Sequence, residues 1–541
     1  MFQLLCAIAC GLGFAVSLPP YDCGILCWVA IAPLLYAACG RRPLEAVGLG
    51  LVAGLVCAVF QGRWHEDTTR LFWGYLPFLW VTVFFALAAL ASCLLRPRLT
   101  PAQWVAAIAC AGIALEWVTT WLPLPVHIAL TQYRNVPLIQ IASITGIWGV
   151  SLLLWTVNAA IADAFLSRRA LTVPIRWCAA ALPAVLAFGA LEIRNERSDP
   201  GRPFVAAAIQ DFSGDETGGL APDPLKPADR DMQTVEATSG SRPARLVVWS
   251  EECLGYGFDP AGARDATRKL ARERNAVLVA GFNDTAHPKP HNCAAVVNAD
   301  GATAGVFQKM HLYLSERQTN IPGAPRPAVD TAVGKVGAEV CFDSCYTGVT
   351  RGLAASGAQV IAMPNYDPPT PRGVLHNLHS AILPFRAVEN HVPFVRSDSN
   401  GLSQVIDSRG RILAEGPLYR AAIVSARIVP GDGRGTFFTK TGDWLAWLCI
   451  GGFLLLARKR SLPLQQRGAR DQQDRSGDAR GIERLPLNAE PSEIVDDGSG
   501  DQLPDDRCGN GTLRADLGQG DNRRQDHGHA DHAAEPHPPR R

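Results

Sequence analysis

The feature that most constrains the fold is a series of long apolar windows that fills the first 200 residues, with one more far downstream. The windows lie at about 4–19, 24–40, 45–62, 71–95, 104–122, 138–166, 173–193 and 443–457. A helix needs about 20 residues to cross roughly 30 Å of hydrocarbon, so most of these windows are long enough to span a bilayer. The first window lacks a basic segment before it, so we interpret it as a retained helix rather than a cleaved signal peptide. The sequence therefore predicts a membrane α-helical bundle of about eight transmembrane helices.

Basic residues next to the windows predict the orientation, because Lys and Arg beside spans prefer the cytoplasmic side. With the N-terminus inside, the outer connections carry only Arg63, Arg70 and Arg134. The inner connections carry Arg41, Arg42, Arg96, Arg98, Arg168, Arg169, Arg176, Arg458, Lys459 and Arg460. The polar segment between the seventh and eighth windows is therefore expected outside the cytoplasm.

Composition divides the chain into four parts. These are a seven-helix transmembrane domain (1–200), a globular segment (203–435), a C-terminal transmembrane helix (440–460) and a tail (461–541). The tail contains no Phe, Trp or Tyr and cannot bury enough apolar surface to fold, so we predict that it is disordered. Its histidines, His527, His529, His532 and His537, are interpreted as part of this polar tail rather than as a metal site. With 51 basic and 50 acidic side chains, the chain has no net field that would attract nucleic acid.

The globular segment alternates between short apolar runs and helix-like stretches. Runs of four to eight apolar, β-branched residues bounded by Gly, Pro and Asp indicate strands. They lie at 204–209, 246–249, 276–280, 294–298, 336–341, 359–363, 393–396 and 422–428. Helices are expected at 259–275 and 374–390, and the Asn298-Ala299-Asp300-Gly301 turn predicts a hairpin. This alternation predicts an α/β fold of sheets covered by helices.

Three polar residues each follow one of these apolar runs. Glu251 ends Val247-Val248-Trp249-Ser250-Glu251, Lys309 follows Val306-Phe307-Gln308, and Cys341 follows Val340. A carboxylate, an ammonium and a thiol at one sheet edge form a nucleophilic site, in which the carboxylate takes the thiol proton. The lysine would hold the developing oxyanion and keep the pKa of the thiol low. Taken singly, each residue also has an ordinary structural explanation.

The order and context of these residues resemble the carbon-nitrogen hydrolase (nitrilase) superfamily, whose fold is an αββα sandwich. With seven windows before the segment and one after it, the resemblance narrows to the membrane-bound apolipoprotein N-acyltransferases. It rests on motifs in both parts of the chain and covers about residues 5–457. The motifs are Trp249–Glu251, Lys309–Leu312 with Glu316, Cys341–Asp343, Asn365–Asp367, His376–Glu389, Ser399–Gly401, Pro33–Leu35, Glu116–Trp117 and Gly146–Leu153.

The resemblance implies acyl transfer in two steps, without a cofactor or a metal. Cys341 would take an acyl chain from a phospholipid as a thioester and pass it to the amino group of a diacylglyceryl apolipoprotein. Glu251 would be the base, with Glu252 in reserve, and Lys309 and the Phe342 backbone N–H would stabilise the oxyanion. The implied location is the bacterial inner membrane, with the catalytic domain on the periplasmic side and no nucleic-acid partner.

Several further residues are carried over with supporting roles. Glu316 is implied to act near the triad lysine. Asp343 replaces a usual glutamate and is expected to orient Lys309 or to hold its own loop by a hydrogen bond. Glu116, with Trp117, is a substrate-access candidate, with a structural hydrogen bond as the alternative.

Other candidates have plainer interpretations. Asp163 is expected to extend towards the cytoplasmic surface, and His376 and His379 are interpreted as packing residues rather than metal ligands. Cys341 and Cys345 could bridge or share a metal, but no second pair at zinc spacing accompanies them. Two other functions remain possible interpretations of the sequence. One is a membrane-tethered amidase that uses the same residues to pass the acyl group to water, and the other is an inactive polytopic scaffold that uses none of them.

Overall fold

The structure is a computed structural model that describes residues 1–62, 71–121, 127–194, 202–211, 227–255, 262–284, 288–368 and 374–459. The chain divides into one unit at Met1–Gln466 and a second at Arg467–Arg541. The second unit lies outside the described residues, and so do Arg63, Arg70, Arg460 and the tail histidines.

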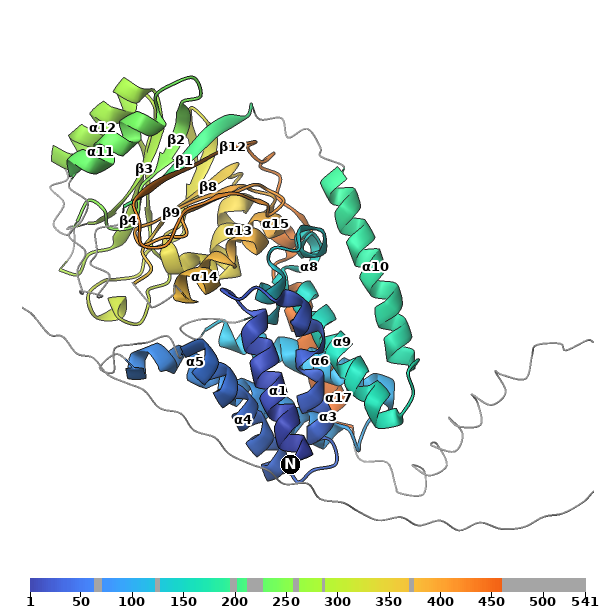
Figure 1. Ribbon diagram of the computed structural model, residues 1–541. Coiled ribbons are helices and arrows are strands. Elements are labelled where there is room, and N and C mark those ends of the chain that lie inside the picture. Colours follow the sequence, from blue (N-terminus) through green and yellow to red (C-terminus); the bar gives the residue numbers. More distant parts are fainter. Residues whose placement is uncertain are drawn as a thin grey trace, which may run out of the picture. The chain divides into compact units, whose positions relative to one another are not determined.

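Every apolar window of the sequence is helical in the structure (Figure 1). The helices of this part are α1 (Phe2–Ser17), η1 (Gly24–Leu26), α2 (Cys27–Ala30), α3 (Ala32–Ala38), α4 (Pro43–Gly62), α5 (Leu71–Leu95), α6 (Pro101–Thr119), η2 (Ile128–Gln132), α7 (Val136–Ile139), α8 (Ala142–Thr145), α9 (Ile147–Ser167), α10 (Val173–Arg194), α16 (Phe437–Thr441) and α17 (Trp444–Ala457). Within the described residues, four helices are long and apolar enough to cross a membrane: Pro43–Gln61, Pro101–Thr119, Ile147–Ser167 and Val173–Arg194. Apart from α5 (Leu71–Leu95), the remaining apolar helices of the described residues are shorter, so the number of eight stays a prediction.

Two of the predicted windows are broken by residues that the pattern of apolar side chains does not reveal. The second window divides at Ile31, where the carboxamide of Asn158 on α9 accepts hydrogen bonds from the backbone N–H of Ile31 and Ala32 at 2.8 and 2.9 Å. The sixth divides at Gly146, whose φ of +66° favours glycine and whose added Cβ would lie 2.5 Å from the ring of Phe438. At Ile31, a buried side chain therefore supplies the backbone partners that an interrupted membrane helix needs.

The segment after α10 forms two six-stranded sheets that pack face to face between layers of helices. One sheet has the order β12-β1-β2-β3-β4-β5, and the other β11-β10-β9-β8-β7-β6. Figure 1 shows α11 and α12 covering one outer face and α13, α14 and α15 covering the other. The strands are β1 (Phe204–Gln210), β2 (Ala244–Val248), β3 (Val277–Asn283), β4 (Asn292–Val297), β5 (Thr303–Gln308), β6 (Val329–Thr331), β7 (Gly334–Ala338), β8 (Val360–Asn365), β9 (Phe394–Asp398), β10 (Gln404–Ile406), β11 (Ile412–Glu415) and β12 (Ala422–Ile428), and the helices are α11 (Pro227–Ala237), α12 (Gly262–Arg274), α13 (Thr347–Ala355), α14 (Val374–Ser380) and α15 (Leu383–Asn390).

The expected αββα layering and the hairpin at Asn298–Gly301 are confirmed, whereas several element boundaries differ. The run at 336–341 ends as a strand at Ala338, and Cys341 begins a short 3₁₀ helix, η4 (Cys341–Cys345). The helix expected at 374–390 is two helices, and Pro384 occupies the first turn of the second, where its missing N–H needs no partner. Strands β6 and β10 have only three residues each, too few to show an alternating pattern.

Hydrogen bonds join one end of the helical part to the sandwich. Gln140 donates from Nε2 to the Arg409 carbonyl at 2.9 Å. Asp443, just before α17, accepts from Trp148 Nε1 at 2.8 Å and from Thr347 of the sandwich at 3.0 Å. The backbone N–H of Ile147, at the start of α9, donates to Glu389 of α15 at 2.8 Å. The residues around 134–148 therefore form the joint between the helices and the sandwich.

The opposite end of the same helices carries the basic connections. Asp163, about 24 Å along α9 from Ile147 at 1.5 Å per residue, is fully buried and forms an ion pair with Arg96 at 2.7 Å. The expectation that Asp163 extends towards the membrane surface is therefore wrong, because Arg96 reaches inward to it. Cys93 of α5 donates to the Arg41 carbonyl at 3.1 Å, which gathers these connections at one end.

Candidate active site

Three strand ends bring Glu251, Lys309 and Cys341 together. Glu251 follows β2, Lys309 follows β5 and Cys341 follows β7, and all three side chains are buried. Lys309 Nζ lies 2.8 Å from Glu251 Oε1, and Cys341 Sγ lies 3.6 Å from the Tyr366 carbonyl. A cavity of about 390 Å³ is lined by Glu251, Cys341 and twelve further residues. A larger hollow of about 1070 Å³, at the opposite ends of the strands, contains none of the three.

Burial and charge give the first two residues opposite protonation properties. Burial raises the pKa of Glu251 to about 7, and the carboxylates of Glu316 and Glu252 add to this rise while Lys309 opposes it. Burial lowers the pKa of Lys309, but three acidic neighbours, the Cys341 thiol and the carboxyl groups of Glu251 and Glu316, outweigh burial and raise this pKa well above its usual range. Lys309 therefore stays a cation, and Glu251 exchanges a proton near neutral pH.

The prediction that the Cys341 thiol has a low pKa is wrong. Burial raises the pKa of this thiol well above its usual range, and the charges of Glu251, Asp367 and Glu316 raise it further. Lys309 lowers it, but two carboxylates already share that cation. The resting sulfur is consequently a neutral thiol, and its proton must leave during the attack itself.

The backbone of Cys341 adopts a left-handed conformation, with φ at +47°. A residue other than glycine pays roughly 1–3 kcal/mol for such a conformation, and residues held this way cluster at active sites. Ser344, three residues on, donates from Oγ to the Cys341 carbonyl at 3.1 Å. The turn places the nucleophile beyond the end of β7, at the cavity wall.

Asp343 joins the loop of Cys341 to the loop of Lys309. Its carboxylate accepts hydrogen bonds from the backbone N–H of Met310 at 3.0 Å, His311 at 2.8 Å and Val340 at 3.3 Å. The sequence suggested that Asp343 either orients Lys309 or holds its own loop, and these contacts correspond to the second role. Asp343 therefore sets the separation between the two catalytic candidates that it links.

Glu316 lies beside Lys309, in a 3₁₀ turn, η3 (Glu316–Gln318). Its Oε1 is 2.8 Å from Lys309 Nζ, and its Oε2 accepts from the Tyr313 backbone N–H at 2.7 Å. Asn292, which the sequence analysis missed, donates to Glu251 at 2.6 Å and to Glu316 at 3.1 Å. Asn292 starts β4, and its carbonyl accepts from the Lys309 backbone, so only strand pairing identifies it.

Aromatic rings surround the nucleophile and continue towards the helices. The ring of Phe342 packs edge-on against Tyr313 and Tyr346, with centroids 5.4 and 5.5 Å away. Tyr346 lies 5.9 Å from Trp121, which lies 6.2 Å from Trp117. Trp117, a substrate-access candidate, also contacts Trp447 of α17 at 4.6 Å. The structure thus places Trp117 in a row of rings that leads to the nucleophile loop.

Glu116 does not face a lipid entry, because its side chain is fully buried within the helical part. Its carboxylate accepts from Trp155 Nε1 at 2.8 Å and Ser151 Oγ at 2.6 Å, and lies 3.3 Å from His127 Nδ1. Of the two interpretations of Glu116, substrate access and a structural hydrogen bond, these contacts favour the second. It ties α6 to α9.

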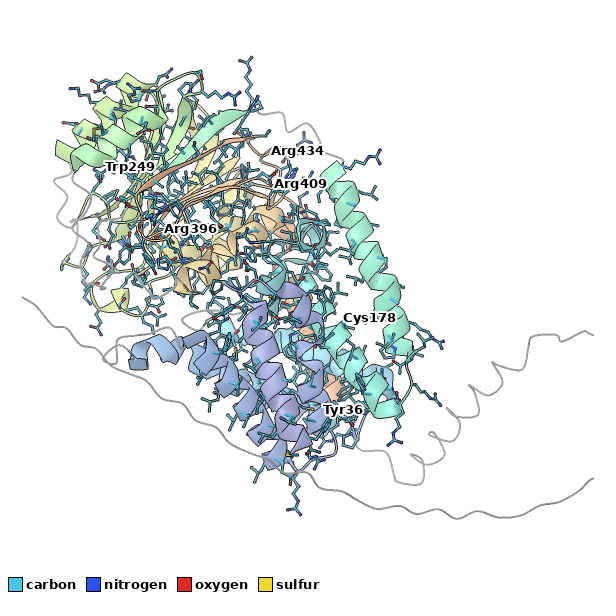
Figure 2. All side chains as sticks on the ribbon, in the orientation of Figure 1. Tyr36, Cys178, Trp249, Arg396, Arg409 and Arg434 are labelled. Carbon is cyan, nitrogen blue, oxygen red and sulfur yellow. The ribbon has the colours of Figure 1, made fainter. Side chains whose placement is uncertain are left out.

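The structure also places His379 at the site, although the sequence analysis treated it as a packing residue. Cys341 Sγ, a carboxylate oxygen of Asp367 and a ring nitrogen of His379 all lie within 4.8 Å of one another. Asp367 accepts from Arg396 Nη2 at 2.5 Å, and Figure 2 shows Arg396 inside the sandwich. A guanidinium fixed on this carboxylate disfavours a metal cation there, because like charges repel.

Comparisons with known proteins match both parts of the chain. Residues 10–160 match the model of the apolipoprotein N-acyltransferase N-terminal domain, and residues 221–436 match that of carbon-nitrogen hydrolases. An apolipoprotein N-acyltransferase of Geobacter metallireducens is 29% identical over 84% of this chain and 94% of its own length. Those of Gloeobacter violaceus and Chlorobaculum tepidum are 25% and 22% identical, over 86% and 83% of this chain and 96% and 94% of their own.

A solved carbon-nitrogen hydrolase of Helicobacter pylori G27 aligns with 42% of this chain and 89% of its own, at 22% identity and a TM-score of 0.36. The two matching models follow one another along the chain, in the order that the helical part and the sandwich have in the structure. The relatives cover both parts and nearly their own full lengths. The chain belongs to the apolipoprotein N-acyltransferases, a membrane-bound branch of the carbon-nitrogen hydrolases.

Proposed function

We propose that this enzyme transfers an acyl chain from a phospholipid to the N-terminal amine of diacylglyceryl-cysteine in lipoproteins, through a thioester on Cys341. The observation that carries the proposal is the buried contact of Lys309 with Glu251 at 2.8 Å, in a site that shares its cavity with Cys341. The names of the relatives supply the type of reaction.

In the first half-reaction, the Glu251 carboxylate takes the proton of the Cys341 thiol while sulfur attacks the ester carbonyl carbon. The carbonyl oxygen becomes an oxyanion, which Lys309 Nζ and the Phe342 backbone N–H stabilise. Collapse of this intermediate breaks the ester C–O bond, and Glu251 gives its proton to the leaving alkoxide. The products are a lysophospholipid and a thioester on Cys341.

In the second half-reaction, the neutral amine of the acceptor attacks the thioester carbon and loses a proton to Glu251. The C–S bond then breaks, and the Cys341 sulfur recovers the proton from Glu251. The acceptor leaves as an amide, and thiol and carboxylate return to their starting states. A carboxyl group with a pKa of about 7 suits this shuttle, because it both accepts and returns a proton near neutral pH.

Membrane attachment supports this choice of substrates. Each CH₂ group drawn from a bilayer into water costs about 0.8 kcal/mol, so a long acyl chain needs an apolar route to the cysteine. The row of Trp117, Trp121 and Tyr346 leads from the helices to the nucleophile loop and suits such a route. We propose that residues 1–200 and 440–460 form about eight spans in a bacterial inner membrane, and that 203–435 form the periplasmic catalytic domain.

The proposal is tested by incubating the purified protein with a phospholipid labelled in its acyl chain, then adding a diacylglyceryl-cysteine peptide. We expect a hydroxylamine-sensitive label on the wild-type chain but none on Cys341→Ala, and passage of the label to the peptide amine. Release of free fatty acid in place of amide would instead support a hydrolase. Absence of any labelled thioester would support an inactive scaffold.

A further inference from the structure

We propose that Asp367, His379 and Ser344 form a hydrogen-bonded relay that holds the backbone of Cys341 in its left-handed conformation. His379 is thereby a positioning residue for acyl transfer, an inference that rests on the proposed function for its role but not for its geometry.

The relay is continuous from a buried ion pair to the nucleophile. Arg396 donates to Asp367 at 2.5 Å, and Asp367 lies 2.9 Å from His379 Nδ1. The other ring nitrogen, Nε2, lies 2.9 Å from Ser344 Oγ. Ser344 Oγ in turn donates to the Cys341 carbonyl at 3.1 Å. All five residues are at most 7% exposed, so water does not replace a broken link readily.

Counting hydrogens along the proposed relay gives the charge that it requires of the imidazole ring. In this relay the single hydrogen of the Ser344 hydroxyl goes to the Cys341 carbonyl, so the hydrogen between Ser344 and His379 belongs to His379 Nε2. An ionised Asp367 only accepts hydrogen bonds, so His379 Nδ1 carries a hydrogen as well. With both nitrogens protonated, His379 is an imidazolium. A neutral ring would take the Ser344 hydrogen and leave the Cys341 carbonyl without this donor.

The surroundings of His379 agree with this charge. Burial lowers the pKa of His379, but the nearby charge of Asp367 outweighs burial, and Cys345 adds to it, so the pKa rises to about 10. Asp367 itself has a lowered pKa: burial would raise it, but His379 and Arg396 outweigh burial. The other titratable or charged groups that act on this pair come from η4, α14, β9 and the residues that follow β5, β7 and β8; they are Tyr313, Glu339, Cys341, Cys345, Tyr366, His376, Arg396 and Asp398.

The relay has a second anchor on the same serine. The backbone carbonyl of Ser344 accepts from Arg386 Nε at 2.9 Å, and Arg386 is fully buried. The backbone of Ser344 is therefore held by Arg386, while its hydroxyl contacts His379 and the Cys341 carbonyl. A displacement of about 1 Å at a nucleophile is enough to cost roughly 100-fold in rate.

The test cuts one link at a time. His379→Asn keeps a donor for Asp367 but loses the nitrogen that faces Ser344, and Ser344→Ala removes only the hydroxyl. The matched control is His376→Asn, one turn earlier on α14, where the histidine is equally buried but packs edge-on against Tyr419. Ser344→Thr restores a hydroxyl and serves as the conservative rescue.

Two rates are measured for each variant: alkylation of Cys341 by iodoacetamide, followed on the Cys341 peptide by mass spectrometry, and single-turnover thioester formation from phospholipid. We expect His379→Asn and Ser344→Ala each to lower both rates by about 10- to 100-fold, with the half-saturating phospholipid concentration unchanged. The rates of the double variant should fall no further than those of the more impaired single variant, because one missing link already breaks the relay. His376→Asn and Ser344→Thr should stay within about threefold of wild type.

Multiplied losses in the double variant, or a near-normal alkylation rate in folded Ser344→Ala, would overturn the relay. An equal loss in His376→Asn would do the same, because it would trace the effect to the packing of α14. If wild-type protein forms no thioester with phospholipid, the proposed function fails, while the alkylation rates still decide the relay. If His379→Asn does not fold, Ser344→Ala alone decides it.

Discussion

Glu251 handles the proton of Cys341 in both half-reactions, and its pKa of about 7 makes the first of them sensitive to pH. Below this pKa the carboxyl group is protonated and cannot accept the thiol proton. We therefore expect the single-turnover acylation rate to rise with pH through about 7 and then to level off, since Lys309 remains a cation across this range. Measurement between about pH 5.5 and 9 checks this, and a flat profile would remove Glu251 as the base.

Glu316 adjusts that pKa from a distance, because its negative charge raises the pKa of Glu251. In Glu316→Gln, the acidic limb of the pH profile should move to lower pH, while Lys309 keeps its contact with Glu251 at 2.8 Å. Glu252→Gln should shift the limb in the same direction by less, since Glu252 has the smaller effect. A shift to higher pH in Glu316→Gln would mean that the carboxylate acts on Glu251 mainly through Lys309.

The sequence identifies Glu251, Lys309 and Cys341 because each follows an apolar strand. In the structure, Glu251 and Cys341 line one cavity, and Lys309 contacts Glu251. Asn292 and His379 carry no such mark. Their partners lie 41 and 35 residues away, at Glu251 and Ser344, so only the folded chain reveals them. The high pKa of Cys341 was equally out of reach, because it depends on burial and on carboxylates from three other segments.

At the scale of elements, Asp343 holds the loops after β5 and β7 together, because its carboxylate accepts hydrogen bonds from both. Asp343→Ala leaves three backbone N–H groups without their acceptor, which should lower the free energy of unfolding by about 1–3 kcal/mol. It should also lower the acylation rate roughly 100-fold, because Lys309 and Cys341 lose their fixed separation. Thermal unfolding and single-turnover acylation check both effects. Asp343→Asn retains one acceptor oxygen, so its stability and acylation rate should lie between those of wild type and Asp343→Ala. A wild-type acylation rate in Asp343→Ala would show that Asp343 does not couple the loops of Lys309 and Cys341.

The contact between α6 and α9 depends on Glu116, so its replacement should act on stability rather than on substrate entry. Glu116→Leu removes the acceptor of Trp155 and Ser151 and the partner of His127, and should cost about 2 kcal/mol, at roughly 0.6–2 kcal/mol for each bond between membrane helices. The half-saturating phospholipid concentration should not change. Glu116→Gln keeps an acceptor and is the matched control. A tenfold rise in half-saturation without loss of stability would restore the role in substrate access.

Helix positions were predictable from the long apolar windows, because such stretches must be removed from water. The breaks inside the windows were not predictable from composition. The division at Ile31 depends on Asn158, more than 120 residues away, and at Gly146 the ring of Phe438 leaves no room for a side chain. The early end of β7 at Ala338 has a similar cause. The next residues leave the sheet so that Cys341 can take its left-handed turn, which an apolar run does not signal.

At the scale of the whole molecule, the orientation makes a prediction that is independent of chemistry. The connection at Gly40 lies with Arg41 at the end that carries the basic residues, whereas Asp300 is exposed at the β4–β5 turn of the sandwich. In intact spheroplasts, an epitope inserted after Asp300 should bind antibody, and one inserted after Gly40 should bind only after permeabilisation. The reverse pattern would place the catalytic domain in the cytoplasm and exclude lipoproteins of the outer face as acceptors.

The joint around residues 134–148 decides how members of this family can exchange parts. Glu389 holds the N-terminus of α9 and also forms an ion pair with Arg386, which binds the carbonyl of Ser344 next to the nucleophile. A chimera that grafts one relative's sandwich onto another's helices at the linker near residue 200 would cut across this assembly. The sandwich and the start of α9 should therefore be exchanged together. Chimeras that take both from the same relative should be active, whereas chimeras joined at the linker near residue 200 should not.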